Sequence, residues 1–130
     1  MTRAALHATR TPVAQADAGR VLAKALTRAA RALDLSQREV ARLLGVSEAT
    51  ASRLVRGRAL DPESKPGELA VLFLRIFRSL DALVGGNEAS ARAWLHGPNL
   101  HLNGTPVVMI QTALGVVLVS EYLDAMRGRL

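Results

Sequence analysis

The sequence has no cysteine and few aromatic residues: of its 130 residues, 3% are Phe, Trp or Tyr. Without cysteine the chain cannot form disulfides, zinc ribbons, cysteine-ligated iron–sulfur clusters or a thiol nucleophile. It also lacks a long hydrophobic run. No residue between Arg92 and Glu121 is formally charged, but the apolar part of this segment, residues 107–119, is interrupted by Gln111 and Thr112. Because spanning a bilayer takes roughly 20 apolar residues, we expect this segment to lie in a protein core.

Alanine and leucine dominate what is present, with 22 Ala and 21 Leu. Both residues are strong helix formers, so the composition predicts an all-α protein. A chain of this length buries roughly two thirds of its unfolded surface, which is enough for a core without covalent staples.

Acidic residues are scarce in the first half of the chain. Residues 1–60 carry 11 basic and 4 acidic side chains, a net charge of +7, whereas residues 61–130 carry 6 basic and 7 acidic ones, a net charge of −1. The whole formal excess of +6 therefore lies in the N-terminal half, which predicts attraction to nucleic acid or an anionic surface. Four of these cations form a stripe at helical spacing, which we interpret as a solvated helix face: Arg20, Lys24, Arg28 and Arg31.

Hydrophobic periodicity predicts a series of helices separated by turn residues. After a flexible leader over residues 1–18, a first helix is expected over 19–33. Ser36 with Glu39 forms the capping-box pattern of a second helix, which ends before Gly45, and Ser47 can cap a third. Later helices are expected at 68–84, 87–95, 106–113 and 115–126. The proline- and glycine-containing segment 58–67 is the predicted boundary between a helix–turn–helix domain (19–62) and a second helical domain (68–130).

Residues 37–56 carry the strongest motif in the chain. Ala41 is small where the two helices would cross, and Gly45 permits the positive φ that the turn needs. Five apolar residues are expected to face inward: Val40, Leu44, Val46, Ala51 and Leu54. The outward positions of the second helix are short polar or basic residues, which suit base edges and phosphates in a major groove. A generic helical hairpin would pack in the same way, but the polar second helix and the +7 half favour DNA binding.

The candidate DNA contacts divide by chemistry. Arg53 is the predicted guanine reader, and Thr50 is a candidate contact to a base edge or methyl group. Gln37 is expected to reach a phosphate or to support the second helix, and Glu48 to stabilise the helix dipole or accept from a cytosine amino group. The full candidate set is Gln37, Ser47, Glu48, Thr50, Ser52, Arg53, Arg56 and Arg58.

Residues 36–57 resemble the Xre-type, phage repressor-like helix–turn–helix family. The resemblance implies that the helix over 47–56 enters the major groove. It also implies that the protein acts as a homodimer on a palindromic operator.

The C-terminal half offers no visible catalytic or metal-binding arrangement. His96 and His101 lie five residues apart with no acidic residue in the intervening loop, and a zinc site needs three or four protein ligands. No histidine is close in sequence to Ser120 and Glu121, and no glycine-rich phosphate loop occurs. We therefore expect neither an enzyme nor a metal or other cofactor.

The segment from Ala93 to Pro106 resembles the toxin-binding domain of the Xre/MbcA/ParS antitoxin family. The resemblance lies in a Trp-Leu pair, a Pro-Asn pair and a Gly-x-Pro followed by a closing helix, here Trp94-Leu95, Pro98-Asn99 and Gly104-Thr105-Pro106. It extends over about residues 68–130, and the Xre-type half precedes it in the order that the family uses.

This resemblance implies a type II antitoxin in the bacterial cytoplasm. Its partner would be a RES-domain toxin, an enzyme that degrades NAD⁺ or transfers ADP-ribose from it. The C-terminal domain would cover the toxin's NAD⁺ pocket, and the complex would repress its own operon. The candidate toxin contacts, with the last helix and tail as the inserted element, are Trp94, Pro98, Asn99, Tyr122, Met126, Arg127, Arg129 and Leu130.

Two other functions remain open from the sequence. One is a stand-alone Xre-type transcription regulator whose C-terminal half dimerises or senses a ligand, because an apolar helical domain serves dimerisation as well as toxin capture. The other is a small NAD-related enzyme, which the absence of a candidate nucleophile or acid–base pair disfavours. A RES-type toxin gene in the adjacent reading frame would support the antitoxin.

Overall fold

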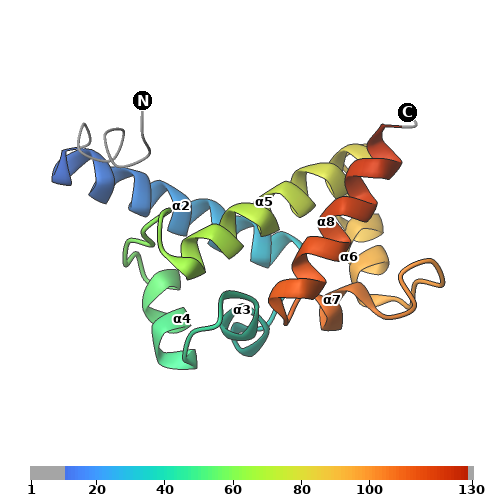
Figure 1. The fold of residues 1–130 in the computed structure, drawn as a ribbon, viewed down its shortest axis with the longest axis horizontal. Helices are drawn as coiled ribbons and strands as arrows, with labels where there is room; N and C mark the ends of the chain where they lie inside the picture. The colour runs from blue at the N-terminus through green and yellow to red at the C-terminus, as the bar shows by residue number, and fades with distance from the viewer. Residues whose placement is uncertain (1–10, 129–130) are drawn as a thin grey trace.

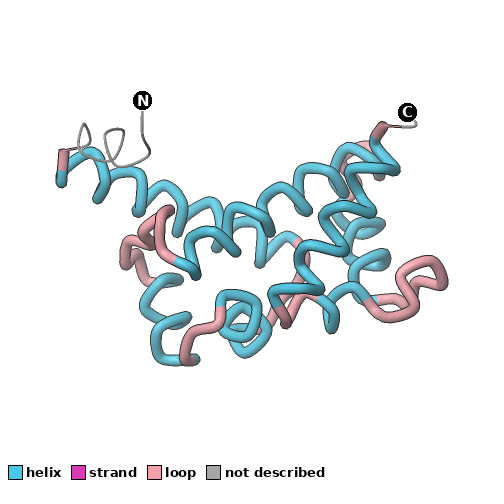
Figure 2. Tube along the Cα trace, viewed as in Figure 1, coloured by secondary structure: helices cyan, strands magenta, loops and turns pink. Residues whose placement is uncertain are grey.

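The computed structural model describes residues 11–128, which form helices joined by turns and loops without a β-strand (Figures 1 and 2). The all-α prediction is therefore confirmed. The helices over this range are α2 (Pro12–Ala32), α3 (Gln37–Leu44), α4 (Glu48–Val55), α5 (Lys65–Leu83), α6 (Glu88–His96), α7 (Pro106–Met109) and α8 (Ala113–Arg127). None of these helices combines the length and hydropathy of a membrane span.

Helix α2 begins earlier than the sequence indicates. It starts at Pro12, capped by Thr11, whose Oγ1 accepts a hydrogen bond from the N–H of Ala14 at 3.1 Å. Residues 12–18 of the predicted leader are therefore helical, and residues 1–10 lie outside the described range. The apolar periodicity begins only at Gly19 because the first two turns are largely exposed, with 71% of Val13 accessible to solvent. An exposed helical turn needs no apolar pattern, so hydrophobic periodicity predicted the start of α2 too late in the chain.

Local capping rules describe α3 and α4 well. The side chain of Ser36 accepts from the N–H of Glu39, and the Glu39 carboxylate accepts from the N–H of Ser36, so the predicted capping box is present. Gly45 ends α3 with a φ of 69°, in the left-handed region that favours glycine. Ser47 then caps α4 by accepting from the N–H of Thr50 at 3.0 Å.

Helix α5 links the two halves of the chain. It begins at Lys65 behind the N-cap Ser64 and packs against α2 and α3 on one side and against α8 on the other. Its buried residues, including Phe73 and Ile76, belong to one hydrophobic core that draws side chains from both halves. The predicted boundary segment is also fixed to the fold, because the N–H of Leu60 donates to the carbonyl oxygen of Gly19 at 3.0 Å.

The last helices differ in detail from the prediction. Helix α7 ends at Met109, whereas the sequence predicted a helix over 106–113. Helix α8 starts at Ala113, so Gly115 lies inside it and does not separate two helices. A Cβ on Gly115 would lie 1.7 Å from the carbonyl oxygen of Met109. The glycine is therefore needed for the close approach of α7 and α8.

Candidate functional site

The inward residues of the helix–turn–helix pin α4 against α2 and α3. Val40, Leu44, Ala51 and Leu54 are all buried, and Val46 is half-buried against the same core. This agrees with the predicted inward set. Because Ala51 and Leu54 face the core, the opposite side of α4 faces solvent.

The outward side of α4 carries the candidate DNA contacts. Glu48 and Arg53 on the helix are exposed, as are Arg56 and Arg58 just after it, while Thr50 and Ser52 are half-buried. Most of the candidate DNA contacts on α4 and just after it are therefore accessible to solvent.

Ser47 and Thr50 also bond to each other. The Ser47 hydroxyl donates to Oγ1 of Thr50 at 3.0 Å and accepts from the Thr50 N–H at the same distance. Both side chains help to fix the start of α4.

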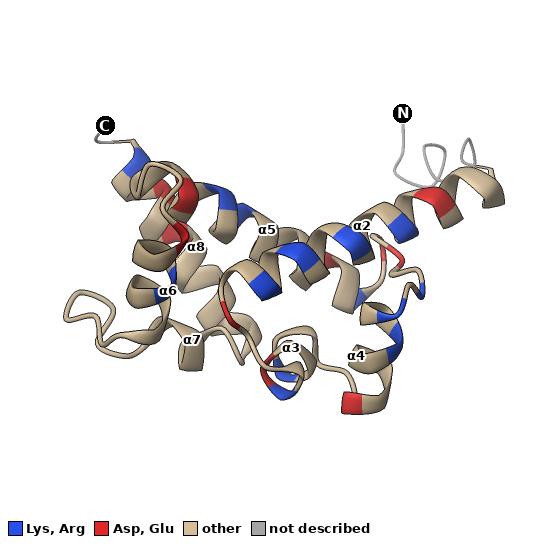
Figure 3. Ribbon diagram, turned by 180° about the vertical axis from the view of Figure 1, so that it is seen from behind, with Lys and Arg blue, Asp and Glu red and all other residues tan. Residues whose placement is uncertain are grey.

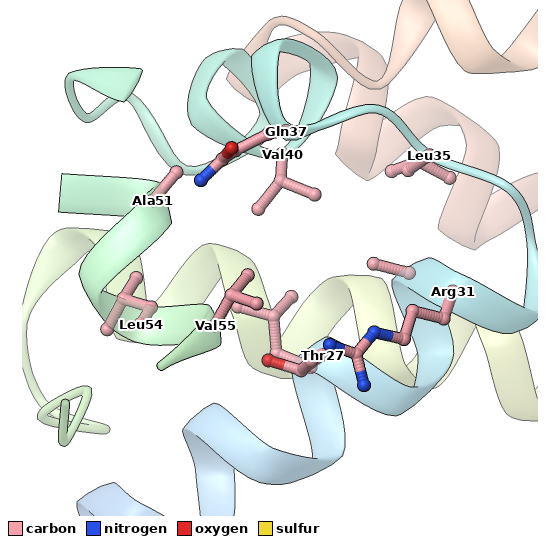
Figure 4. A pocket seen from close by; sticks show the side chains of 10 residues that line it. Thr27, Arg31, Leu35, Gln37, Val40, Ala51, Leu54 and Val55 are labelled. Atoms are coloured by element: carbon pink, nitrogen blue, oxygen red, sulfur yellow. The ribbon is translucent and has the colours of Figure 1, made fainter. Parts of the chain in front are cut away.

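Gln37 lies at the mouth of an open, mainly apolar cavity of about 160 Å³ between α2, α3 and α4. Figure 4 shows its amide turned toward Ala51 of α4, with Thr27 and Arg31 of α2 on the opposite side of the cavity. Of the two roles predicted for Gln37, this orientation favours support of the second helix.

The two histidines of the C-terminal half have separate structural contacts. Nε2 of His96 lies 2.8 Å from the carbonyl oxygen of Leu33 and ties α6 to the end of α2. His101 stacks on Tyr122 of α8, with ring centroids 6.2 Å apart and planes 24° apart. Within residues 11–128 no three His, Cys, Asp or Glu side chains gather as a metal site would require.

Trp94 and Tyr122, both candidate toxin contacts, stack on each other. Their ring centroids lie 6.3 Å apart with an interplanar angle of 16°, and both side chains are half-buried. Tyr122 thus joins α6, the loop after it and α8 through its two aromatic neighbours. The stacked rings therefore help to hold α6, the loop after it and α8 against one another.

The loop between α6 and α7 is closed by hydrogen bonds. The backbones of Asn99 and Gly104 pair in both directions, at 2.9 and 3.2 Å, and Oδ1 of Asn99 accepts from the N–H of Leu102 at 3.0 Å. This closure leaves the Leu100 side chain at the loop tip, 96% exposed. Pro98 is also exposed, whereas Asn99 is committed to shaping the loop.

The first half of α8, residues 113–119, is apolar on every side, a feature that the sequence reasoning missed. One face is buried against α5, but Leu114 and Leu118 are 69% and 42% exposed, and Val117 is 39% exposed. Val108 of α7 is also exposed. The signal was present in the spacing of residues 114, 117 and 118, which defines a second apolar face beside the core positions.

The end of α8 is packed against α5. Arg127 donates to Oγ of Ser79 at 3.3 Å, and Asp124 forms an ion pair with Arg75 at 2.6 Å. Met126 is half-buried. The candidate contacts Arg129 and Leu130 lie outside the described residues.

Two family models match successive parts of the chain. The antitoxin Xre-like helix–turn–helix domain matches residues 12–75, and the antitoxin Xre/MbcA/ParS C-terminal toxin-binding domain matches residues 79–129. No curated protein matches the chain.

The family border lies inside α5, beyond the boundary segment 58–67 that the sequence predicted. Helix α5 packs with α2 and α3 as well as with α8, so both matched regions share it.

Proposed function

The chain belongs to the Xre/MbcA/ParS family of antitoxins, and we propose that it neutralises a RES-domain toxin and represses its own operon. As an antitoxin of this family it has two partners, DNA and a toxin. The proposal adds the identity of the toxin, the occlusion of its NAD⁺ site by the C-terminal half, and operator binding by a homodimer.

The DNA partner is supported by the geometry of α4. Ala51 and Leu54 anchor the helix in the core, so it presents Arg53 and Glu48 to solvent. Arg56 and Arg58 follow at its end, where they can contact phosphates. Insertion of α4 into a major groove would bring base-reading and phosphate-binding groups to the duplex together.

The toxin partner is supported by one observation above all, the exposed apolar face of α8. A helical segment that is apolar on all sides is normally buried, yet Leu114, Val117 and Leu118 in the first half of α8 remain accessible. Apolar groups that gather on a surface mark a protein interface. With Leu100 and Val108, this face offers a toxin the apolar area that an obligate interface buries.

Occlusion of the NAD⁺ site is assigned to the end of α8 and the tail. Arg127 and Arg129 would pair with acidic or polar groups of the toxin's pocket, since guanidinium groups form strong charge-assisted hydrogen bonds. Tyr122 and Met126 would add apolar contact beside them. The exposed face of α8 would dock the helix, and its end would then close the pocket.

The decisive experiment is co-expression with the product of the neighbouring reading frame. Deleting residues 68–130 is a poor test because α5 contributes to the core of both halves. The double variant Leu114→Lys/Leu118→Lys changes exposed residues only and is expected to abolish protection. A matched control, Val13→Lys/Val21→Lys, changes two exposed valines of α2 and is expected to protect like the wild type.

Two readouts separate the parts of the proposal. Growth reports neutralisation, and cellular NAD⁺ together with ADP-ribosylated protein reports the toxin's reaction. A toxic neighbour that neither lowers NAD⁺ nor transfers ADP-ribose would disprove the RES assignment. Full protection by the α8 double variant would disprove the proposed toxin surface.

The same apolar face supports the second candidate, a stand-alone transcription regulator that dimerises through its C-terminal half. Sedimentation of the purified chain distinguishes the two functions. If the α8 double variant converts a dimer to a monomer while protection persists, the face joins two copies of this chain. If protection is lost and the oligomeric state is unchanged, it binds the toxin.

A further inference from the structure

We propose that the basic face of α2 and the end of α4 form a second DNA contact, which holds the phosphate backbone beside the groove that α4 enters. The inference rests on the proposed DNA-binding function. It extends the contact to residues that the sequence indicated only as a solvated helix face. The ligand is the phosphodiester backbone of double-stranded DNA, bound without regard to base sequence.

The surface is concave and lies next to α4. A hollow of about 500 Å³ is lined by the basic stripe of α2 on one side and, on the other, by Leu54 and Val55 at the end of α4 and Gly57 after it. The basic residues of this wall are Arg20, Lys24, Arg28 and Arg31. Figure 3 shows the stripe facing the viewer along α2, with the basic residues of α4 at the same end of the molecule.

The charge of the hollow is uncompensated. No acidic side chain is among the residues that line it. Arg20 forms an ion pair with Asp17, but Lys24, Arg28 and Arg31 have no ion pair with any residue in the range 11–128. The Thr27 hydroxyl donates to the carbonyl oxygen of Ala23. The positive charges of the three cations can therefore attract an external anion. A concave surface with one sign of charge concentrates the attraction for a polyanion.

The hollow meets the surface that α4 presents to DNA at the end of the helix. It opens at Val55 and Gly57, immediately beside Arg56 and Arg58, the predicted phosphate contacts. From residue 20 to residue 31 the helix rises about 16 Å, at 1.5 Å per residue. A strand that follows the stripe over that length can place successive phosphates beside successive cations. A backbone that leaves the end of α4 can therefore run along the stripe.

The position favours DNA over an acidic protein as the partner. The basic hollow lies on α2 and α4, whereas the large apolar residues exposed after residue 79 lie on α7, α8 and the loop that carries Leu100. A toxin held on the apolar surface is thus bound by different elements from those that line the hollow.

The test compares two double variants of the full chain that remove the same charge. Lys24→Gln/Arg28→Gln lies in the hollow. Arg78→Gln/Arg92→Gln changes exposed cations on α5 and α6 and serves as the control. Fluorescence anisotropy with an operator duplex and a scrambled duplex is measured from 50 to 300 mM salt, and thermal melting confirms that each variant is folded.

The hollow variant is expected to bind both duplexes about tenfold more weakly at low salt and to reduce the slope of log K against log salt by about two. The control is expected to keep the wild-type slope. If the hollow variant keeps the wild-type salt slope, this inference is wrong. If the wild type prefers its operator in the same experiment, the proposed function stays intact.

Two further outcomes are also decisive. If the wild type shows no preference for its operator, the proposed repressor function fails. If the hollow variant binds DNA normally but no longer protects against the toxin, the basic face holds a protein, and the inference is wrong.

Discussion

The two halves of this antitoxin present opposite kinds of surface on similar helices. Helix α4 buries Ala51 and Leu54 and exposes polar and basic residues, whereas α8 buries Val116 and Val119 and exposes more apolar ones. Water solvates the exposed polar side of α4 well, so this side needs no partner to cover it. The second surface is stable only when something covers it. We therefore expect DNA binding to depend on salt and toxin binding to depend on buried apolar area.

The two surfaces are not carried by independent bodies. Helix α5 contributes to one core with α2 and α3 on one side and α8 on the other. A change in either half can therefore affect the other through stability. Loss of stability and loss of one binding surface can be told apart by variants that change only one of them.

The largest effect is expected for Gly115→Ala. A Cβ at this position would lie 1.7 Å from the carbonyl oxygen of Met109, a rigid backbone atom, so α7 and α8 must move apart. We expect a loss of about 3 kcal/mol in the free energy of unfolding. Because the core is shared, chemical denaturation should show one transition that is shifted as a whole.

Gly128→Ala is the matched control. Its added Cβ would meet no atom closer than 3.5 Å, and its backbone is right-handed helical, so stability should stay close to wild type. Two separate unfolding transitions in Gly115→Ala, with only one of them shifted, would show that the halves fold independently and would contradict the shared core.

Arg53→Ala should affect the DNA-binding half alone. If Arg53 reads a guanine, its loss removes about 2 kcal/mol of preference for the operator over a scrambled duplex. The side chain is exposed and forms no ion pair within the described chain, so stability and toxin neutralisation should not change. Competition binding with the two duplexes measures the preference. An unchanged ratio would remove Arg53 from the base-reading set.

Arg56→Ala tests a different role on the same surface. A phosphate contact carries no sequence information, so its loss should weaken binding to both duplexes equally and lower the salt slope by about one. Salt titration by fluorescence anisotropy checks this. Equal salt slopes in the variant and the wild type would contradict the phosphate role.

Leu100→Ser is the corresponding test for the apolar half. The side chain is 96% exposed in the isolated protein, so the change should not alter stability. If the toxin covers the loop tip, affinity should fall by about 1.5 kcal/mol, the lower end of the value for burying a leucine. Titration calorimetry with the toxin measures the loss, and Val13→Ser on α2 is the control. An unchanged toxin affinity would place Leu100 outside the interface.

The parts of this fold that obey local rules were predictable from the sequence. Ser36 and Glu39 determine the start of α3, and Gly45 its end, through atoms within a few residues of each other. The caps at Thr11 and Thr112 follow the same rules but were not predicted. No apolar pattern marks the helix that begins after Thr11. Gly115 suggested a break between helices just after Thr112.

The candidate sites depended more on contacts distant in sequence. The motif located α4, but the hollow beside it exists only because α2 lies against the end of α4. The role of Tyr122 likewise depends on rings at positions 94 and 101. No spacing rule supplies those contacts. The exposed face of α8 required knowledge of which side α5 covers.

The smallest expected effect concerns the attachment of α8 to α5. Asp124→Asn removes the ion pair with Arg75, whose atoms lie 2.6 Å apart, but both side chains remain partly accessible. Water and salt therefore replace most of the interaction, and stability should fall by only about 0.5 kcal/mol. A thermal melt at low and high salt checks this, because the difference between variant and wild type should shrink as salt rises. If neutralisation nevertheless falls steeply in the folded variant, the ion pair matters chiefly for holding the end of α8 in place for the toxin. That outcome would extend the toxin surface from the exposed apolar face to the end of the helix.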